Sequence, residues 1–187
     1  MPFQISEFQS TINTYIPQRS NLFTMTIEGG PASALASGNS DTTIAWLCTA
    51  TTFPGVTITP IEKPFFGRNM KFPGEMVFAD WSTSIINDNG YAVRNIIEKW
   101  MAMMNTHQTN VREFGQKVGT EFATAHIQGY DQNGQVGGTS QINFKGIWPT
   151  SLSPITLNYD TTGDIEQFDV GWAYQYWTVE SIAGGVN

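Results

Sequence analysis

The chemically reactive side chains are few and lie far apart in this 187-residue sequence. The two histidines, His107 and His126, and the single cysteine, Cys48, have no His, Cys or carboxylate companion at the spacing of a metal site. A nucleophilic thiol also needs a neighbouring base, which Cys48 lacks in its own segment. We therefore predict that both histidines are structural, that Cys48 is a buried, inert thiol, and that no internal disulfide forms.

The stretch 131–138 contains fragments of two ligand-binding motifs, and both are incomplete. Asp131, Asn133 and Gly134 begin like a calcium loop, but no Glu stands at the closing position. Gly134 to Gly138 lacks the lysine and the strand-to-helix context of a phosphate loop. Because Asn-Gly between two apolar segments is typical of a hairpin turn, we predict a turn here, with no metal and no cofactor.

Three carboxylates, Asp160, Asp164 and Glu166, are close enough in sequence to be considered as an acid and base pair. They flank a predicted β-turn at 161–164, however, and carboxylates beside such turns are usually solvated. We therefore expect no catalytic residues and no enzymatic activity.

A single helix is expected to organise the chain, within residues 85–105. A β-type pattern stops at Asn87, Asp88 and Asn89, whose side chains can accept hydrogen bonds from the first helical turn. Arg94 and Glu98 then have the spacing of a surface ion pair. One face is apolar, with Val93, Ile96, Ile97, Trp100, Met101 and Met104. Such a face must cover a sheet.

Alternating and β-favouring patterns predict that sheet. The expected strands are residues 21–28, 42–52, 76–86, 122–130, 141–148, 155–159 and 165–179, with the stretch 148–154 turning the chain. In the last strand one face would carry Phe168, Val170, Trp172, Tyr174 and Tyr176. The expected core residues include Trp81, Ile96, Ile97, Trp100, Trp148 and Phe168. The sequence predicts a mainly β domain, a sandwich or barrel with one flanking helix.

Three segments are expected to lie outside this single domain of residues 1–187. Residues 1–19 form a short helix or an N-terminal arm, and residues 29–41, rich in Gly, Ala and Ser, form a flexible loop. Residues 56–75 carry three prolines, which favour a projecting hairpin arm over a central strand. On this arm Phe65, Phe66, Arg68 and Lys71 are the candidates for a subunit interface, because exposed aromatics usually meet a partner and the cations would find carboxylates on it.

The composition favours self-association. Charged residues make up 13% of the chain, about half of the usual share of roughly 25%. The net charge of −7 argues against tight binding to nucleic-acid phosphates, although nucleic acid can slide past such a surface. The first residues lack the pattern of a secretory signal and no stretch is long enough to span a membrane, so we expect a cytoplasm-like compartment.

Short segments in a fixed order resemble the T4-like tail tube proteins of contractile-tailed bacteriophages. They are NLF (21–23), CTATTFPG (48–55), GRNMKFPGE (67–75), FADW (78–81), ND (87–88), the helix 94–100, KGIWPT (145–150), IEQFDV (165–170) and YW (176–177). The segment 106–119 matches this pattern poorly, and the loop 29–41 is longer than the family pattern requires.

The resemblance implies a structural virion protein, a subunit of hexameric rings stacked into the inner tail tube, with strands joining across subunits. The implied partners are other copies of the chain, the tail sheath, and baseplate and tube-initiator proteins. Genomic DNA and the tape-measure protein would pass through the lumen without specific binding. The implied location is the virion, after assembly in the host cytoplasm and without membrane insertion.

Two alternatives remain open from the sequence. The first is a tube initiator, or the tube of a related contractile injection or secretion system, which the sequence does not separate cleanly from a phage tail tube. A β-sandwich carbohydrate-binding module would instead use the aromatic residues between Phe168 and Tyr176 to contact sugar.

Overall fold

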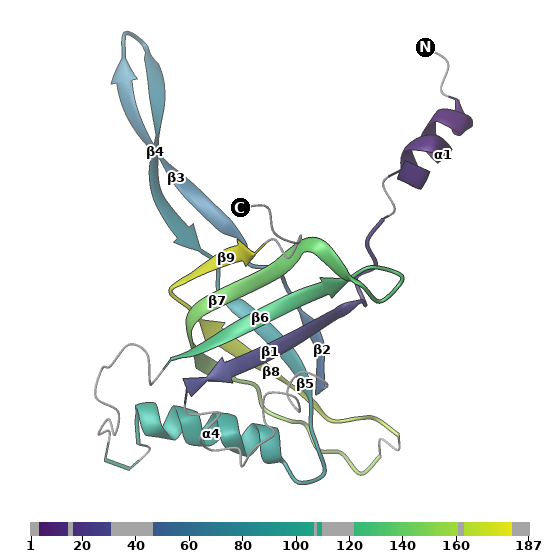
Figure 1. Cartoon of the computed structure of the whole chain (residues 1–187). Coiled ribbons are helices and arrows are strands. Elements are labelled where there is room, and N and C mark those ends of the chain that lie inside the picture. Colours follow the sequence, from purple (N-terminus) through teal and green to yellow (C-terminus); the bar gives the residue numbers. More distant parts are fainter. Residues whose placement is uncertain are drawn as a thin grey trace.

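The computed structural model describes residues 4–14, 17–30, 47–106, 108–109, 122–160 and 163–180 (Figure 1). The helices are α1 (Ile5–Thr14) and α4 (Ala92–Met104). The strands are β1 (Phe23–Gly29), β2 (Cys48–Thr51), β3 (Val56–Phe65), β4 (Arg68–Phe78), β5 (Trp81–Ile86), β6 (Ala123–Tyr130), β7 (Val136–Leu152), β8 (Gln167–Ala173) and β9 (Tyr176–Glu180).

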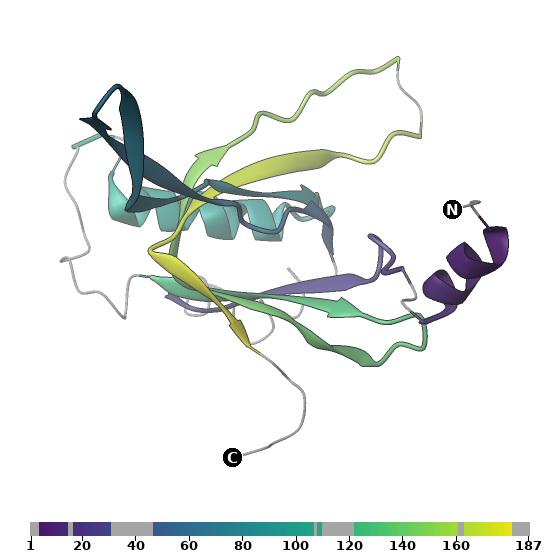
Figure 2. The ribbon, with the colours of Figure 1, turned by 90° about the horizontal axis from the view of Figure 1, so that it is seen from above.

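The long strand β7 joins two antiparallel layers (Figure 2). Its residues up to Ile147 pair with β6, which pairs with β1, and its residues 141–145 also pair with β9. From Trp148 onward it pairs with β8 of the second layer, which continues through β5 to β2. Gly146 lies between the two halves at φ 69°, a conformation that favours glycine, and so lets β7 change layers. This mainly β architecture with α4 along one side confirms the predicted fold class.

Aromatic side chains from both layers and the helix fill the core. Trp81 of β5 stacks on Phe144 of β7 with ring centroids 4.4 Å apart, and Trp100 of α4 lies 5.9 Å from Trp172 of β8. Of the expected core residues, four are buried and two, Ile96 and Trp148, are half-buried against the same cluster. The four buried ones are Trp81, Ile97, Trp100 and Phe168.

Helix α4 has the predicted apolar face. Its buried residues are Val93, Ile97 and Trp100, and the others on that face pack partly against the core. Asp88 accepts a hydrogen bond from the Val93 N–H at 3.4 Å, as expected for an acid ahead of the first turn. Arg94 pairs with Glu98 at 2.9 Å, which confirms the predicted ion pair.

The prediction of one strand over residues 76–86 was wrong. Phe78 still pairs with Val56 in the two-stranded sheet of β3 and β4, whereas Trp81 pairs with Trp172 in the second layer. Between them the Ala79 N–H donates to the Gly55 carbonyl, so both ends of the hairpin leave the domain at one point. The alternating pattern runs through this junction and does not reveal which sheet each half joins.

The predicted turn at 148–154 and strand at 155–159 were also wrong. Residues 148–152 continue β7, and the irregular register between Pro149 and Ser151 accommodates the proline. Residues 153–158 then form no regular element. The predicted strand 165–179 is divided into β8 and β9, because Gln175 donates its N–H to the Lys145 carbonyl and turns the chain toward the first layer.

Two segments expected outside the domain have different outcomes. Helix α1 forms over part of the predicted N-terminal arm and has no buried residue, with Ile5, Phe8 and Ile12 exposed. Most of the predicted loop 29–41, His107 and the segment 110–119 lie outside the described residues. In the part of the chain that the structure describes, no helix is long and apolar enough to span a membrane.

Candidate assembly surfaces

The reactive side chains have structural surroundings. Burial raises the pKa of the Cys48 thiol from 9.0 to about 11, so the nucleophilic thiolate is scarce at neutral pH. His126 lies 2.5 Å from Asn143 Oδ1 and 3.3 Å from Glu28 Oε2, contacts that are typical of a structural histidine. Within the described ranges, no three His, Cys, Asp or Glu side chains converge as metal ligands do.

The hairpin turn at residues 131–135 confirms the prediction made for Asn133 and Gly134. The carboxylate of Asp131 accepts hydrogen bonds from the N–H groups of Asn133 and Gln135, and Gly134 has φ 75°. Asp131 therefore shapes a turn, as an Asx residue does.

Strands β3 and β4 form an arm that stands away from both layers (Figure 1). We call residues 56–78 the arm. Its apolar side chains, each roughly half or more exposed, are Val56, Ile58, Ile61, Phe65, Phe66, Met70, Phe72, Met76 and Val77. A segment this apolar is unfavourable in water, and contiguous exposed apolar surface usually marks a contact with a partner.

The outer half of the arm has two unlike faces. Ile61 pairs with Phe72, Lys63 with Met70, and Phe65 with Arg68. Because paired residues and alternate residues of a strand point to the same side, these six side chains share one face. The other face carries Glu62 paired with Lys71, Pro64 paired with Asn69, and Pro60 paired with Pro73. One face is therefore apolar with two cations, and the other is polar and rich in proline.

Phe66 occupies a position where an aromatic residue costs energy. It has φ 45° in the turn before Gly67, and its side chain is 92% exposed. Non-glycine residues in the left-handed region cost on the order of 1 kcal/mol, and two-residue hairpin turns usually carry Asn or Gly there. Among the described residues, the ring pairs edge-on with Phe65 alone, with centroids 4.6 Å apart. This placement is typical of a contact residue, because it contributes little to the fold.

Lys71 has a carboxylate partner on its own arm, and its predicted contact with a neighbouring subunit stays a prediction. Its ammonium lies 3.3 Å from Glu62 on its own arm, and Asn69 donates to the same carboxylate. The cross-strand register places these two side chains opposite each other, so the pair forms within the arm. Lys63 and Arg68, on the apolar face, are the remaining cations of the arm.

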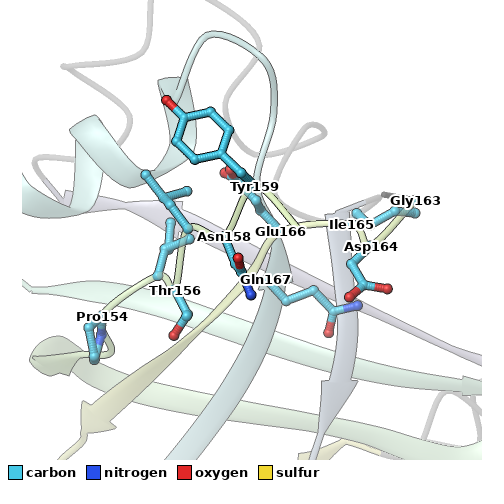
Figure 3. A pocket seen from close by; sticks show the side chains of 11 residues that line it. Pro154, Thr156, Asn158, Tyr159, Gly163, Asp164, Ile165, Glu166 and Gln167 are labelled. Atoms are coloured by element: carbon cyan, nitrogen blue, oxygen red, sulfur yellow. The ribbon is translucent and has the colours of Figure 1, made fainter. Parts of the chain in front are cut away.

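A second open surface lies at residues 153–167, which we call the open loop. Its two limbs enclose a hollow of about 1190 Å³ lined by Pro154, Ile155, Thr156, Leu157, Asn158, Tyr159, Gly163, Asp164, Ile165, Glu166 and Gln167 (Figure 3). Small-molecule sites are typically smaller, about 300–1,000 Å³, and more enclosed. Leu157 is 71% exposed, and Tyr159 and Ile165 are also exposed.

The base of the open loop is held to the domain. The Asn87 side-chain amide donates to the Glu166 carboxylate at 2.8 Å, and the Tyr91 hydroxyl lies 3.3 Å from the same oxygen. Arg94 donates to the Ser153 carbonyl at 3.1 Å. Glu166 is therefore engaged in structure, whereas Asp160 and Asp164 lie exposed on the outer part of the loop.

The expected aromatic face after Phe168 is mostly internal. Phe168, Val170 and Trp172 are buried, Tyr174 lies beyond the end of β8, and Tyr176 begins another strand. A sugar-binding face made of these residues is thus contradicted, because the division into β8 and β9 breaks it and the core covers its first half.

These features define a mainly β domain with two exposed, partly apolar surfaces, the arm and the open loop. Solved structures show the same fold. A chain of the anti-feeding prophage baseplate aligns with a TM-score of 0.63 at 11% identity, covering 89% of this chain and 97% of that one. A chain of the PVC sheath-tube complex, from an extracellular contractile injection system in the extended state, aligns with a TM-score of 0.62 at 14% identity, covering 92% and 97%.

Sequence comparison identifies the family. The model of the phage tail tube protein family matches residues 5–180, and the chain belongs to this family. The tail tube protein gp19 of Enterobacteria phage T4 is 26% identical over 130 residues, which are 70% of this chain and 78% of the phage protein. The corresponding protein of Enterobacteria phage T6 is 25% identical over the same shares. The resemblance stated from the sequence is confirmed, and the chain is a tail tube protein of the contractile-phage type.

Proposed function

We propose that this protein is a structural, non-enzymatic subunit of six-membered rings that stack into the inner tube of a contractile phage tail. The tube would be the conduit for the genome during ejection. Its contacts would be with further copies, with the sheath around the tube, and with the baseplate and tube initiator at its end. The tape-measure protein would occupy the channel before DNA, and assembly would take place in the host cytoplasm before the tube becomes part of the virion.

The observation that carries this proposal is the layer β1-β6-β7-β9. Within the described chain, β1 pairs only with β6 and β9 only with β7, so the layer has a free edge at each side. Free edges tend to pair with strands of other chains. Joining the β1 edge of one copy to the β9 edge of the next would extend the layer around a ring and hide both edges.

The same layer supplies a suitable channel wall. One of its faces packs on the core, whose other side is covered by the second layer and α4. In a closed ring the outer circumference is larger than the inner one, so the bulky side of the subunit, with the second layer and α4, lies outside. The uncovered face of the layer β1-β6-β7-β9 then lies inside and lines the channel. From register and alternation, this face carries Thr24, Thr26, Glu28, Thr124, His126, Gln128, Gln141, Asn143, Lys145, Tyr176, Thr178 and Glu180.

This face would let DNA pass without holding it. It is mainly neutral, with two carboxylates and one lysine, and binding to phosphates requires several cations. Asn143 donates to Glu180 at 2.7 Å and pairs with His126, so the side chains are held against the sheet. A smooth and weakly acidic wall is consistent with the net charge of −7.

Negative-stain electron microscopy of the purified protein tests the proposal. Rings and tubes are expected to form without any cofactor. A protein that light scattering shows to be a stable monomer at high concentration, across salt conditions, would contradict it. Rings that never elongate, even with the sheath protein present, would favour a tube initiator.

A further inference from the structure

The arm and the open loop are complementary in chemistry. The apolar face in the outer half of the arm combines Ile61, Phe65, Met70 and Phe72 with the cations Lys63 and Arg68. The open loop combines the exposed Leu157, Tyr159 and Ile165 with Asp160 and Asp164, and its described residues carry no Lys or Arg. The arm thus offers apolar surface with positive charge, and the open loop offers apolar surface with negative charge. Two surfaces with this complementarity have the combination that gives affinity and register at interfaces.

Shape supports the same pairing. The arm ends in a two-residue turn with Phe66 projecting, whereas the open loop is a hollow of about 1190 Å³, large enough for several side chains. Apart from Gln167, the first residue of β8, the described residues of the open loop belong to no strand, so a hairpin inserted between its limbs need not displace any strand pairing. Aromatic anchors that enter a hollow surrounded by polar groups are typical of the residues that dominate binding energy.

The two surfaces cannot meet within one copy. Figures 1 and 2 show the arm and the open loop extending from opposite ends of the molecule. A contact between them must therefore join two copies head to tail. Such a contact leaves one arm and one open loop free at the ends of every pair, and it continues to add copies until a ring closes or a stack ends.

We propose that the tip of the arm of one copy docks in the open loop of a second copy. Phe65 and Phe66 enter the hollow between Leu157 and Ile165, and Arg68 pairs with Asp164 at its rim. This inference rests on the proposed function, because it names a second contact between tube subunits, in addition to the paired strand edges. It also accounts for the energetically costly placement of Phe66 at the turn.

Chemical cross-linking tests the contact with the full chain. In a Cys48→Ser background, one preparation carries Phe66→Cys and a second carries Leu157→Cys. The two are mixed before assembly and treated with a flexible bis-maleimide, which relaxes the geometric demands of a direct disulfide. We expect a cross-linked dimer in the mixture and much less in either preparation alone. A preparation carrying Gln132→Cys, in the exposed β6–β7 turn, replaces Leu157→Cys as the matched control.

Microscopy of the same samples separates the two ways of failing. If tubes form but Phe66→Cys and Leu157→Cys do not cross-link beyond the Gln132→Cys control, the docking is wrong and the proposed function stands. If neither rings nor tubes form in the Cys48→Ser background or in the unsubstituted protein, the proposed function itself is wrong.

A charge exchange gives an independent test. Arg68→Glu is expected to shorten or abolish tubes, and Asp164→Arg to do the same. The two substitutions together should restore assembly, whereas Arg68→Glu with Glu7→Arg, an exposed acid on α1, should not. Equal tube formation by Arg68→Glu and the unsubstituted protein would overturn the pairing.

Discussion

Trp100 offers a test of how the core is built, because two opposing effects act on the same side chain. The indole is 1% exposed and lies 5.9 Å from Trp172. Truncating a buried Trp to Ala typically costs about 3–5 kcal/mol. Its Nε1–H, however, is buried without an acceptor among the described residues, and an unmet donor costs about 1–3 kcal/mol. Trp100→Ala removes that penalty too, so we expect a net loss of about 2 kcal/mol, the difference between the central values of the two effects.

Trp100→Phe separates the two effects. It keeps most of the apolar ring and removes the unmet donor, so we expect its cost to be about 1 kcal/mol or less. The matched variant is Trp172→Phe, because the Nε1–H of Trp172 donates to Thr83 Oγ1 at 2.9 Å. That substitution loses the same atoms together with a hydrogen bond, and it leaves the buried Thr83 hydroxyl without its donor. We expect it to cost more than Trp100→Phe by about 1–2 kcal/mol.

Urea unfolding followed by far-ultraviolet circular dichroism measures these differences. The variants are best compared in an assembly-deficient background, because self-association adds to apparent stability. At about 2–4 °C per kcal/mol for a chain of this size, the Trp100→Ala loss also lowers Tm by roughly 4–8 °C. If Trp100→Phe costs as much as Trp172→Phe, the donor of Trp100 has a partner and the reasoning fails.

Three further predictions concern the arm and the thiol. Gly74→Ala should abolish tubes but leave the stability of the core unchanged. An added Cβ would overlap the Thr59 carbonyl at the irregular register of the arm, and so distort the arm but not the two layers. Normal tubes by microscopy would refute this. Arg68→Glu combined with Phe65→Ser should give a folded protein that cannot elongate, and full-length tubes alongside a native circular dichroism spectrum would place the contact elsewhere. Because burial raises the Cys48 pKa from 9.0 to about 11, stability should be retained below pH 9 and fall between about pH 9 and 11, and the fall should be smaller in Cys48→Ser, as pH-dependent urea unfolding would show.

Local pattern determined much of this protein. The apolar spacing from Val93 to Met104 predicted the helix and its buried face, because helical periodicity is a property of the segment alone. Asn133 and Gly134 predicted their turn for the same reason. The prolines between 56 and 75 indicated a hairpin outside the main sheet, since a residue without an N–H interrupts a central ladder. The order of short motifs was sufficient to identify the family.

Tertiary structure decided how those segments are joined. Whether residues 76–86 are one strand or two depends on which neighbour each half pairs with, and pairing partners lie far away in sequence. The Glu62–Lys71 pair arises from cross-strand register, and the fate of the aromatic residues after Phe168 depends on the turn at Gln175. The base of the open loop is held by Asn87, Tyr91 and Arg94, side chains near the start of a helix some 60 to 80 residues earlier. Local sequence carries propensity and periodicity, whereas these contacts depend on the relative placement of distant segments.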